Sequence, residues 1–292
     1  MKSEKAIDRQ GVVVKYLMTQ GLSEQHLVAE ALLLRGFPAW ADDQCAWLAE
    51  GIHTSDIFVI SALGAKVDDN AEGALAITTP ADPEAFARSV IYLGEHRGMS
   101  GVGPSEHKRI STWADYRAMK WGAKIPVSPQ PSLKAARENK WSRSENALDI
   151  GVALLVKILP LLRVATSQCC DGHGERPVTV AFHYRWDILW LEAVLKTLRE
   201  HSLFSTAHSE WKIDDALTIT PVDGYLNEET WLALYLDIQT FSRRCMDRSL
   251  IDSVGAARDA VMEHLSPSQE PTESDFLISA EAKLHEHLDA LI

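Results

Sequence analysis

The segment between Gly98 and Trp141 most constrains how this chain can fold. Its stretches "GMSGVGPS" and "PVSPQPS" carry glycine and proline at a density that regular helices and strands do not tolerate. Capping and turn signals stand on both sides of it. We therefore expect four parts: a small α+β unit (1–97), a basic linker (98–141), an α/β unit with a helical end (142–265), and a tether with a terminal helix (266–292).

Local signals in the first unit predict helices alternating with short strands. A serine or an aspartate stands at the N-cap position of three predicted helices, over 24–35, 43–50 and 83–93. The runs "IFVIS" and "ALAIT" are rich in β-forming residues and lie on either side of the turn-prone "GAKVDDNAEG". They predict a hairpin.

The second unit alternates in the same way. A capping box at 142–145 precedes a long apolar helix that Pro160 ends or kinks, and an alternating strand follows at 178–182. Asp187 is expected to cap the next helix. A strand over 216–220 and helices after Asn227 complete the order, which predicts a helix-rich α+β fold with small mixed sheets.

Composition indicates an ordinary globular protein. The chain has 292 residues, of which 46% are hydrophobic, and its amino terminus has neither the apolar core nor the cleavage site of a signal peptide. The most apolar run, 150–162, is too short to span a bilayer and contains Lys157. Four cysteines do not make a disulfide framework in a chain of this size. We expect a cytoplasmic protein without membrane contacts.

The stretch "SQCCDGHGERPVTVAF" (167–182) is the best candidate for chemistry. Its glycines let the backbone adopt positive φ and approach a ligand closely. Cys169 or Cys170 with His173 has the spacing of half a zinc site, and His183 would add a third ligand. Zinc is therefore the cofactor to consider, although the sequence does not supply the other half of the site and the first expectation is that there is no cofactor.

Two further interpretations of this stretch stay open. Cys170, or Cys169, is a candidate nucleophile with His173 as its base and Asp171 orienting a histidine. In the other interpretation one cysteine packs as a small core residue while Asp171 and Gly172 reverse the chain. The sequence commits to no catalytic residue, and a non-enzymatic protein is favoured.

The region "ALDIGVALLVKILPLLRVATSQCCDGHGERPVTVAF" (147–182) resembles uncharacterised phage and bacterial proteins in which an apolar helix leads into a Ser-Cys-Asp-Gly-His-Gly loop and a strand. Residues 170–174 match that loop, whereas Cys169 stands where the pattern has serine. The resemblance implies a phage-encoded accessory protein, such as an inhibitor of a bacterial defence system. It implies no particular reaction.

Charge is distributed unevenly. Net charge is -12, yet Pro104 to Arg143 carries nine basic residues against three acidic ones. Trp113, Trp121 and Trp141 are interleaved with the basic residues. This composition, over 106–143, favours nucleic-acid binding as one alternative, although an acidic chain repels a polyanion at long range.

We expect a binding or regulatory protein that acts by assembling with itself and with a host protein complex. The sequence contains no paired-carboxylate, triad or phosphate-loop motif, but tryptophans and a tethered amphipathic helix suit interfaces. The expected partner-binding residues are Trp113, Trp121, Trp141, Leu284, Leu288 and Leu291. The three leucines lie on one stripe of the terminal helix, which we expect to dock on another subunit or partner; docking on its own chain is the alternative.

Overall fold

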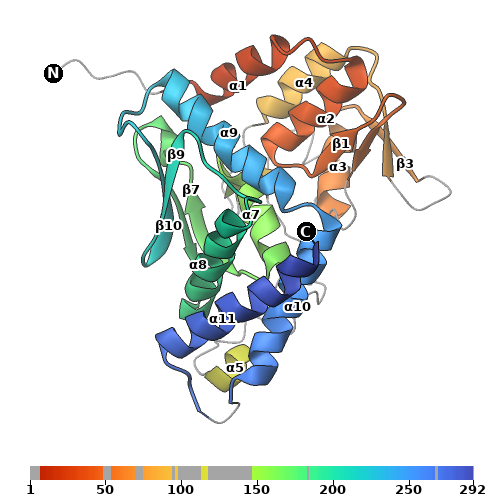
Figure 1. The fold of residues 1–292 in the computed structure, drawn as a ribbon. Helices are drawn as coiled ribbons and strands as arrows, with labels where there is room; N and C mark the ends of the chain where they lie inside the picture. Colours follow the sequence, from red (N-terminus) through yellow and green to blue (C-terminus); the bar gives the residue numbers. More distant parts are fainter. Residues whose placement is uncertain are drawn as a thin grey trace.

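A computed structural model describes residues 7–48, 54–69, 75–93, 96–97, 113–117, 147–182, 184–266 and 269–291. They form a helix-rich α+β fold (Figure 1). The predicted fold class is therefore confirmed. Its two four-stranded sheets are antiparallel throughout, not mixed, with strand orders β1-β2-β4-β3 and β7-β8-β10-β9.

The amino-terminal part alternates short helices with the first sheet. Its helices are α1 (Arg9–Met18), α2 (Glu24–Arg35), α3 (Thr54–Ala62) and α4 (Pro83–Ile91). Its strands are β1 (Ala39–Ala41), β2 (Ala46–Leu48), β3 (Lys66–Asp69) and β4 (Leu75–Thr78). As predicted, α2 ends at Gly36 in the left-handed conformation and Asp82 caps α4 ahead of a proline.

The carboxyl-terminal part contains the second sheet and the longest helices. Its strands are β7 (Thr166–Cys170), β8 (Val178–Phe182), β9 (Ser209–Ile213) and β10 (Ala216–Pro221). Its helices are α7 (Ala153–Ile158) with the 3-10 turn η1 (Leu159–Leu162), α8 (Arg185–Glu200), α9 (Glu228–Arg244), α10 (Arg248–His264) and α11 (Glu273–Leu288) with η3 (Asp289–Leu291). None of the described helices is long and apolar enough to cross a bilayer.

A small ladder joins the ends of the predicted linker. β5 (His96–Arg97) pairs with β6 (Ala147–Leu148), and of the residues between them the structure describes only α5 (Trp113–Arg117). Trp121, Trp141 and most of the basic segment 106–143 lie outside the described residues. The ladder fixes where the chain re-enters the second part, immediately before Asp149.

Two predictions in the first part are wrong. The segment expected as a helix after Asp42 is a hairpin of β1 and β2, because the Asp42 carboxylate accepts hydrogen bonds from the backbone N–H groups of Gln44 and Cys45, both at 2.8 Å. The run "IFVIS" is helical within α3. Its helical spacing places buried Ile60 one turn after Asp56, which forms a buried ion pair with Lys157 at 3.0 Å.

Three predictions for the second part also differ from the structure. Cys169 and Cys170 lie in strand β7 and not in a loop. The apolar helix is only α7, since β6 and a turn on Asp149 occupy the start of the run. Asp187 does not cap α8, which begins two residues earlier at Arg185, and its carboxylate is buried.

Helix α9 connects the two halves of the molecule (Figure 1). Asn227 caps its start, as predicted, and also forms a reciprocal capping box with Thr230. Trp231 and Tyr235 on its first turns pack in the amino-terminal core, whereas Phe241 packs in the core of the second sheet. One amphipathic helix thus supplies residues to both cores.

The terminal helix α11 packs on α8 and α10 of its own chain. Leu284 and Leu288 are fully buried there, and Leu291 is partly exposed. The terminal helix thus docks on its own chain, the alternative, and not on another subunit or partner as expected. Trp113, expected at a partner-binding surface, instead packs among Trp186 and Phe276 in the core.

A buried polar cluster holds α5 against α8 and α10. The Tyr116 hydroxyl donates to Asp187 Oδ1 at 2.8 Å and accepts from the guanidinium of Arg258. Arg258 also lies 3.5 Å from the same carboxylate and over the ring of Trp190. Burial raises the pKa of Asp187 to about 7, and Arg258 only partly offsets that rise.

This shift predicts a pH-dependent contribution to stability. Asp187 binds its proton more tightly in the folded chain than in the unfolded one, whose pKa is about 3.9, so its contribution is complete below about pH 4 and is lost as the pH rises through about 7. Asp187→Asn cannot ionise. We therefore expect the free energy of unfolding of Asp187→Asn, measured with urea, to rise by about 2–3 kcal/mol relative to that of the unsubstituted protein between pH 5 and pH 8.

The control is Asp252→Asn, which removes an exposed ion pair with Arg248 at 3.1 Å. Its effect on the free energy of unfolding should stay within about 0.5 kcal/mol at both pH values. Equal pH profiles for Asp187→Asn and the unsubstituted protein would contradict the prediction.

Candidate metal centre

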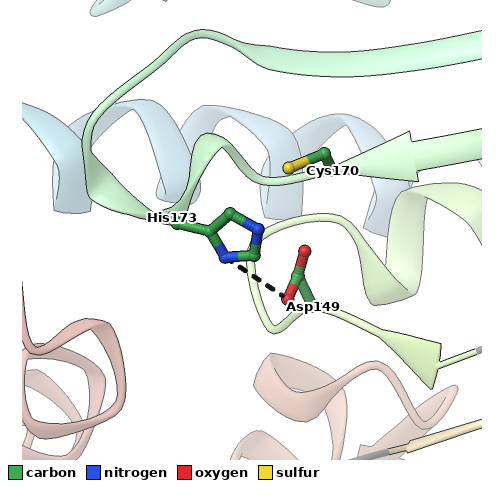
Figure 2. Close-up of side chains that lie close together, drawn as sticks. All are labelled: Asp149, Cys170 and His173. Atoms are coloured by element: carbon green, nitrogen blue, oxygen red, sulfur yellow. Dashed lines mark ion pairs between the residues drawn. The ribbon is translucent and has the colours of Figure 1, made fainter. Parts of the chain in front are cut away.

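Three segments from distant parts of the sequence meet at one end of the second sheet. They are the start of α1 with Arg9, the turn on Asp149 between β6 and α7, and the connection from β7 to β8. Figure 2 shows Asp149, Cys170 and His173 from two of these segments pointing toward one another. They form the candidate site.

The β7–β8 connection holds its shape through an unusual run of backbone conformations. Gly172, His173 and Gly174 all have positive φ, at 73°, 54° and 75°. Glycine adopts this region without strain, whereas histidine rarely does. A methyl group on Gly172 would lie 2.9 Å from the carbonyl oxygen of Pro177, so the close approach also requires glycine.

The buried carboxylate of Asp171 fastens the three segments together. It accepts hydrogen bonds from the backbone N–H groups of His173 at 3.0 Å and Gly151 at 3.2 Å. Arg9 forms an ion pair with the same carboxylate. Asp171 is fully buried, so these donors replace the water that a carboxylate otherwise requires. Asp171 was expected to orient a histidine; it holds the backbone of His173, while the ring Nδ1 lies 3.9 Å from its carboxylate.

Asp149 faces the opposite side of this network. Its Oδ2 accepts from the backbone N–H of Asp171 at 3.4 Å, and its Oδ1 lies 4.0 Å from His173 Nδ1. Partial burial and the negative charge of Asp171 raise the pKa of Asp149, while His173 and Arg9 oppose that rise. A cation placed beside Asp149 would stabilise its ionised form.

The two adjacent cysteines point to different surroundings because successive side chains on a strand alternate. Cys170 Sγ accepts a hydrogen bond from the backbone N–H of Gly172 at 3.3 Å and faces Asp149 and His173. Cys169 packs against the core. Burial raises the pKa of Cys169 to about 12, so its thiol is protonated at neutral pH and is a poor nucleophile or metal ligand.

The three donor atoms have the spacing of an open metal site. One oxygen of Asp149, Cys170 Sγ and one ring nitrogen of His173 all lie within 4.8 Å of one another. Ligand atoms around a tetrahedral Zn²⁺ are about 3.3–3.8 Å apart, given the usual bond lengths. The side chain of His173 is 62% exposed, so a small rotation of this ring can bring its nitrogen to the shorter spacing around an ion.

The structure brings together two of the four residues predicted as metal ligands. Cys170 and His173 meet, Cys169 points away, and His183 lies outside the described residues. The sequence did not indicate Asp149 or Arg9. A polar Asp149 just before an apolar run was the available signal, but it was assigned to the start of a helix.

No protein-family model, no curated protein and no solved structure matches this chain. The resemblance to phage proteins stays a prediction, and the chemistry of the site follows from its own atoms.

The backbone geometry of the connection predicts a specific cost for Gly172→Ala. A side chain at this φ costs about 1–2 kcal/mol, and the contact with Pro177 adds to that cost. Gly21→Ala is the matched control, because Gly21 has φ 63° and a methyl group there would meet nothing within 4 Å. Urea unfolding should show Gly172→Ala to be the less stable variant; equal stabilities would contradict the predicted contact.

Proposed function

We propose that this protein binds Zn²⁺ through Asp149, Cys170 and His173. The fourth coordination position of the ion is open, and the protein functions by binding an external ligand there. The single observation that carries the proposal is the convergence of these three donor atoms within 4.8 Å. Three protein ligands with one open position are the arrangement of catalytic zinc sites, whereas structural sites are closed by four.

The identity of the donors supports zinc over other ions. A thiolate and an imidazole are ligands that Zn²⁺ prefers and that Mg²⁺ and Ca²⁺ do not. The hydrogen bond from the Gly172 N–H orients Cys170 Sγ, and the hydrogen bond from the Asp171 N–H orients Asp149. The ligands thus have supporting contacts of the kind that metal sites require.

Charge is consistent with a divalent ion. Arg9 pairs most closely with Asp171, and its guanidinium also forms a longer ion pair with Asp149, at 3.9 Å. Ionised Asp149 and a Cys170 thiolate together carry the two negative charges that Zn²⁺ balances. Exposed His173 keeps one side of the ion accessible, so a water molecule or a ligand with an oxygen or nitrogen donor can occupy the fourth position.

Cobalt substitution tests the proposal. Protein purified without an affinity tag should bind Co²⁺ and show a thiolate-to-cobalt charge-transfer band, because Cys170 is a ligand. Cys170→Ser should abolish the band, and Cys169→Ser should keep it, since Cys169 points into the core. Azide should bind the cobalt ion at the open coordination position and so change its visible absorption bands. A band that Cys169→Ser removes, or no band at all, would refute the proposal.

Self-assembly is the second candidate function, and one observation favours it. Trp40 on β1 is 50% exposed and stacks on Trp47 with ring centroids 5.8 Å apart. β1 is an edge strand of the first sheet as far as the structure describes it. An exposed aromatic residue on an edge strand is a surface on which a second copy can add its own strand. Contacts with a host protein complex and with nucleic acid stay predictions.

Light scattering tests self-assembly. Trp40→Lys should lower the molar mass of an oligomer, because it removes apolar contact area and places a charge on the edge strand. Tyr92→Lys is the matched control, since Tyr92 is equally exposed but lies at the end of α4, away from the sheet edge. A strict monomer before substitution, or the same loss in both variants, would contradict this candidate.

A further inference from the structure

A second group of metal-binding side chains lies where α8 and α11 end together. His201 is the C-cap residue of α8, His285 lies in the last turn of α11, and Asp289 follows at the start of η3. One donor atom from each lies within 4.8 Å of the others. None of these residues belongs to the site around Cys170.

The ring nitrogens face each other at a distance typical of metal ligands. His201 Nε2 and His285 Nδ1 are 3.0 Å apart, and Asp289 Oδ1 lies 3.7 Å from His201 Nε2. Two nitrogens bound to one tetrahedral Zn²⁺ are about 3.3 Å apart. Without a metal the two nitrogens must share one proton, because two lone pairs at this distance repel each other.

A carboxylate supports the second histidine. Glu200 Oε2 lies 2.9 Å from His285 Nε2, the ring nitrogen that faces away from His201. Metal-bound histidines commonly donate their other ring N–H to a carboxylate, which fixes the tautomer and turns the free nitrogen toward the metal. Glu200 therefore selects the form of His285 in which Nδ1 is a ligand.

Packing holds the two ligand-bearing ends in place. α8 and α11 are in contact, and Lys196 pairs with Glu281 at 2.5 Å one turn before the histidines. The side chain of His201 is only 10% exposed, so its ring is confined to one orientation. The donors thus come from two helix ends that the core already brings together.

We propose that His201, His285 and Asp289 form a second Zn²⁺ site, independent of the first, which fastens the terminal helix to α8. Its donors are two neutral imidazoles and one carboxylate, a set that suits Zn²⁺ and contains no thiolate. Metal binding here links residues 84 apart in the sequence and so stabilises the folded chain, by an amount that rises with the logarithm of the free metal concentration once the site is mostly occupied.

The test uses the full chain, freed of metal and of any affinity tag, and titrated with Zn²⁺ by calorimetry. The unsubstituted protein should bind two ions, and Cys170→Ser should bind one. Adding Asp289→Asn or His285→Ala to Cys170→Ser should remove or weaken that remaining ion at least about 10-fold. Glu200→Gln should also weaken it about 10-fold, through the tautomer of His285.

The matched control is His287→Ala in the Cys170→Ser background, because His287 lies on the same helix but outside the cluster. It should keep the zinc affinity and the zinc-dependent rise in Tm. Circular dichroism checks that each variant folds, and exposed Asp289 is the substitution with the least structural cost. Cys170→Ser protein that binds no zinc, or binds it equally with and without Asp289→Asn, would overturn the inference.

The two sites are distinguishable by their donors. Cobalt at the second site gives no thiolate charge-transfer band, whereas cobalt at the first gives one. A protein that binds a single ion without that band, and loses it in His285→Ala, would support the second site and refute the first.

Discussion

The buried carboxylate of Asp171 is the interaction on which the candidate site depends. Asp171 joins the first helix through Arg9, the turn before α7 through Gly151, and its own hairpin through His173. Transferring a charge from water into the protein interior costs free energy unless charged and polar partners surround it there. Since each partner comes from a different segment, the carboxylate is satisfied only when all three segments have assembled, which places Cys170 and Asp149 opposite each other.

Local signals predicted those parts of the fold that local chemistry decides. The end of α2 at Gly36, the cap of α4 at Asp82 and the start of α9 at Asn227 involve atoms only a few residues apart. The run "IFVIS" was mistaken for a strand because β-propensity measures fit to a surface and not a backbone preference. The helix that contains it carries Asp56, which pairs with Lys157 about one hundred residues away, a contact that local sequence cannot indicate.

The candidate sites could be predicted only in part, for the same reason. Cys170 and His173 are close in sequence, so their spacing was visible, whereas Asp149 joins them through the turn that follows β6. The alternation of the strand decided which of two adjacent cysteines faces the site, and no loop assignment could have shown it. His201 and His285 stand far apart in sequence and meet only because α11 packs on α8.

The two clusters differ in what a metal would do there. The first stands on a hairpin whose backbone is already fixed by Asp171 and by three consecutive positive φ angles. The backbone that carries its ligands is therefore held in place before the ion arrives, and an exposed histidine leaves room for an external ligand. The second spans two helix ends and includes a nearly buried histidine. An ion there would contribute chiefly to holding the terminal helix in place, because its binding energy becomes folding energy. If both clusters bind Zn²⁺ as proposed, exposure and rigidity favour exchangeable ligand binding at the first and a structural role at the second.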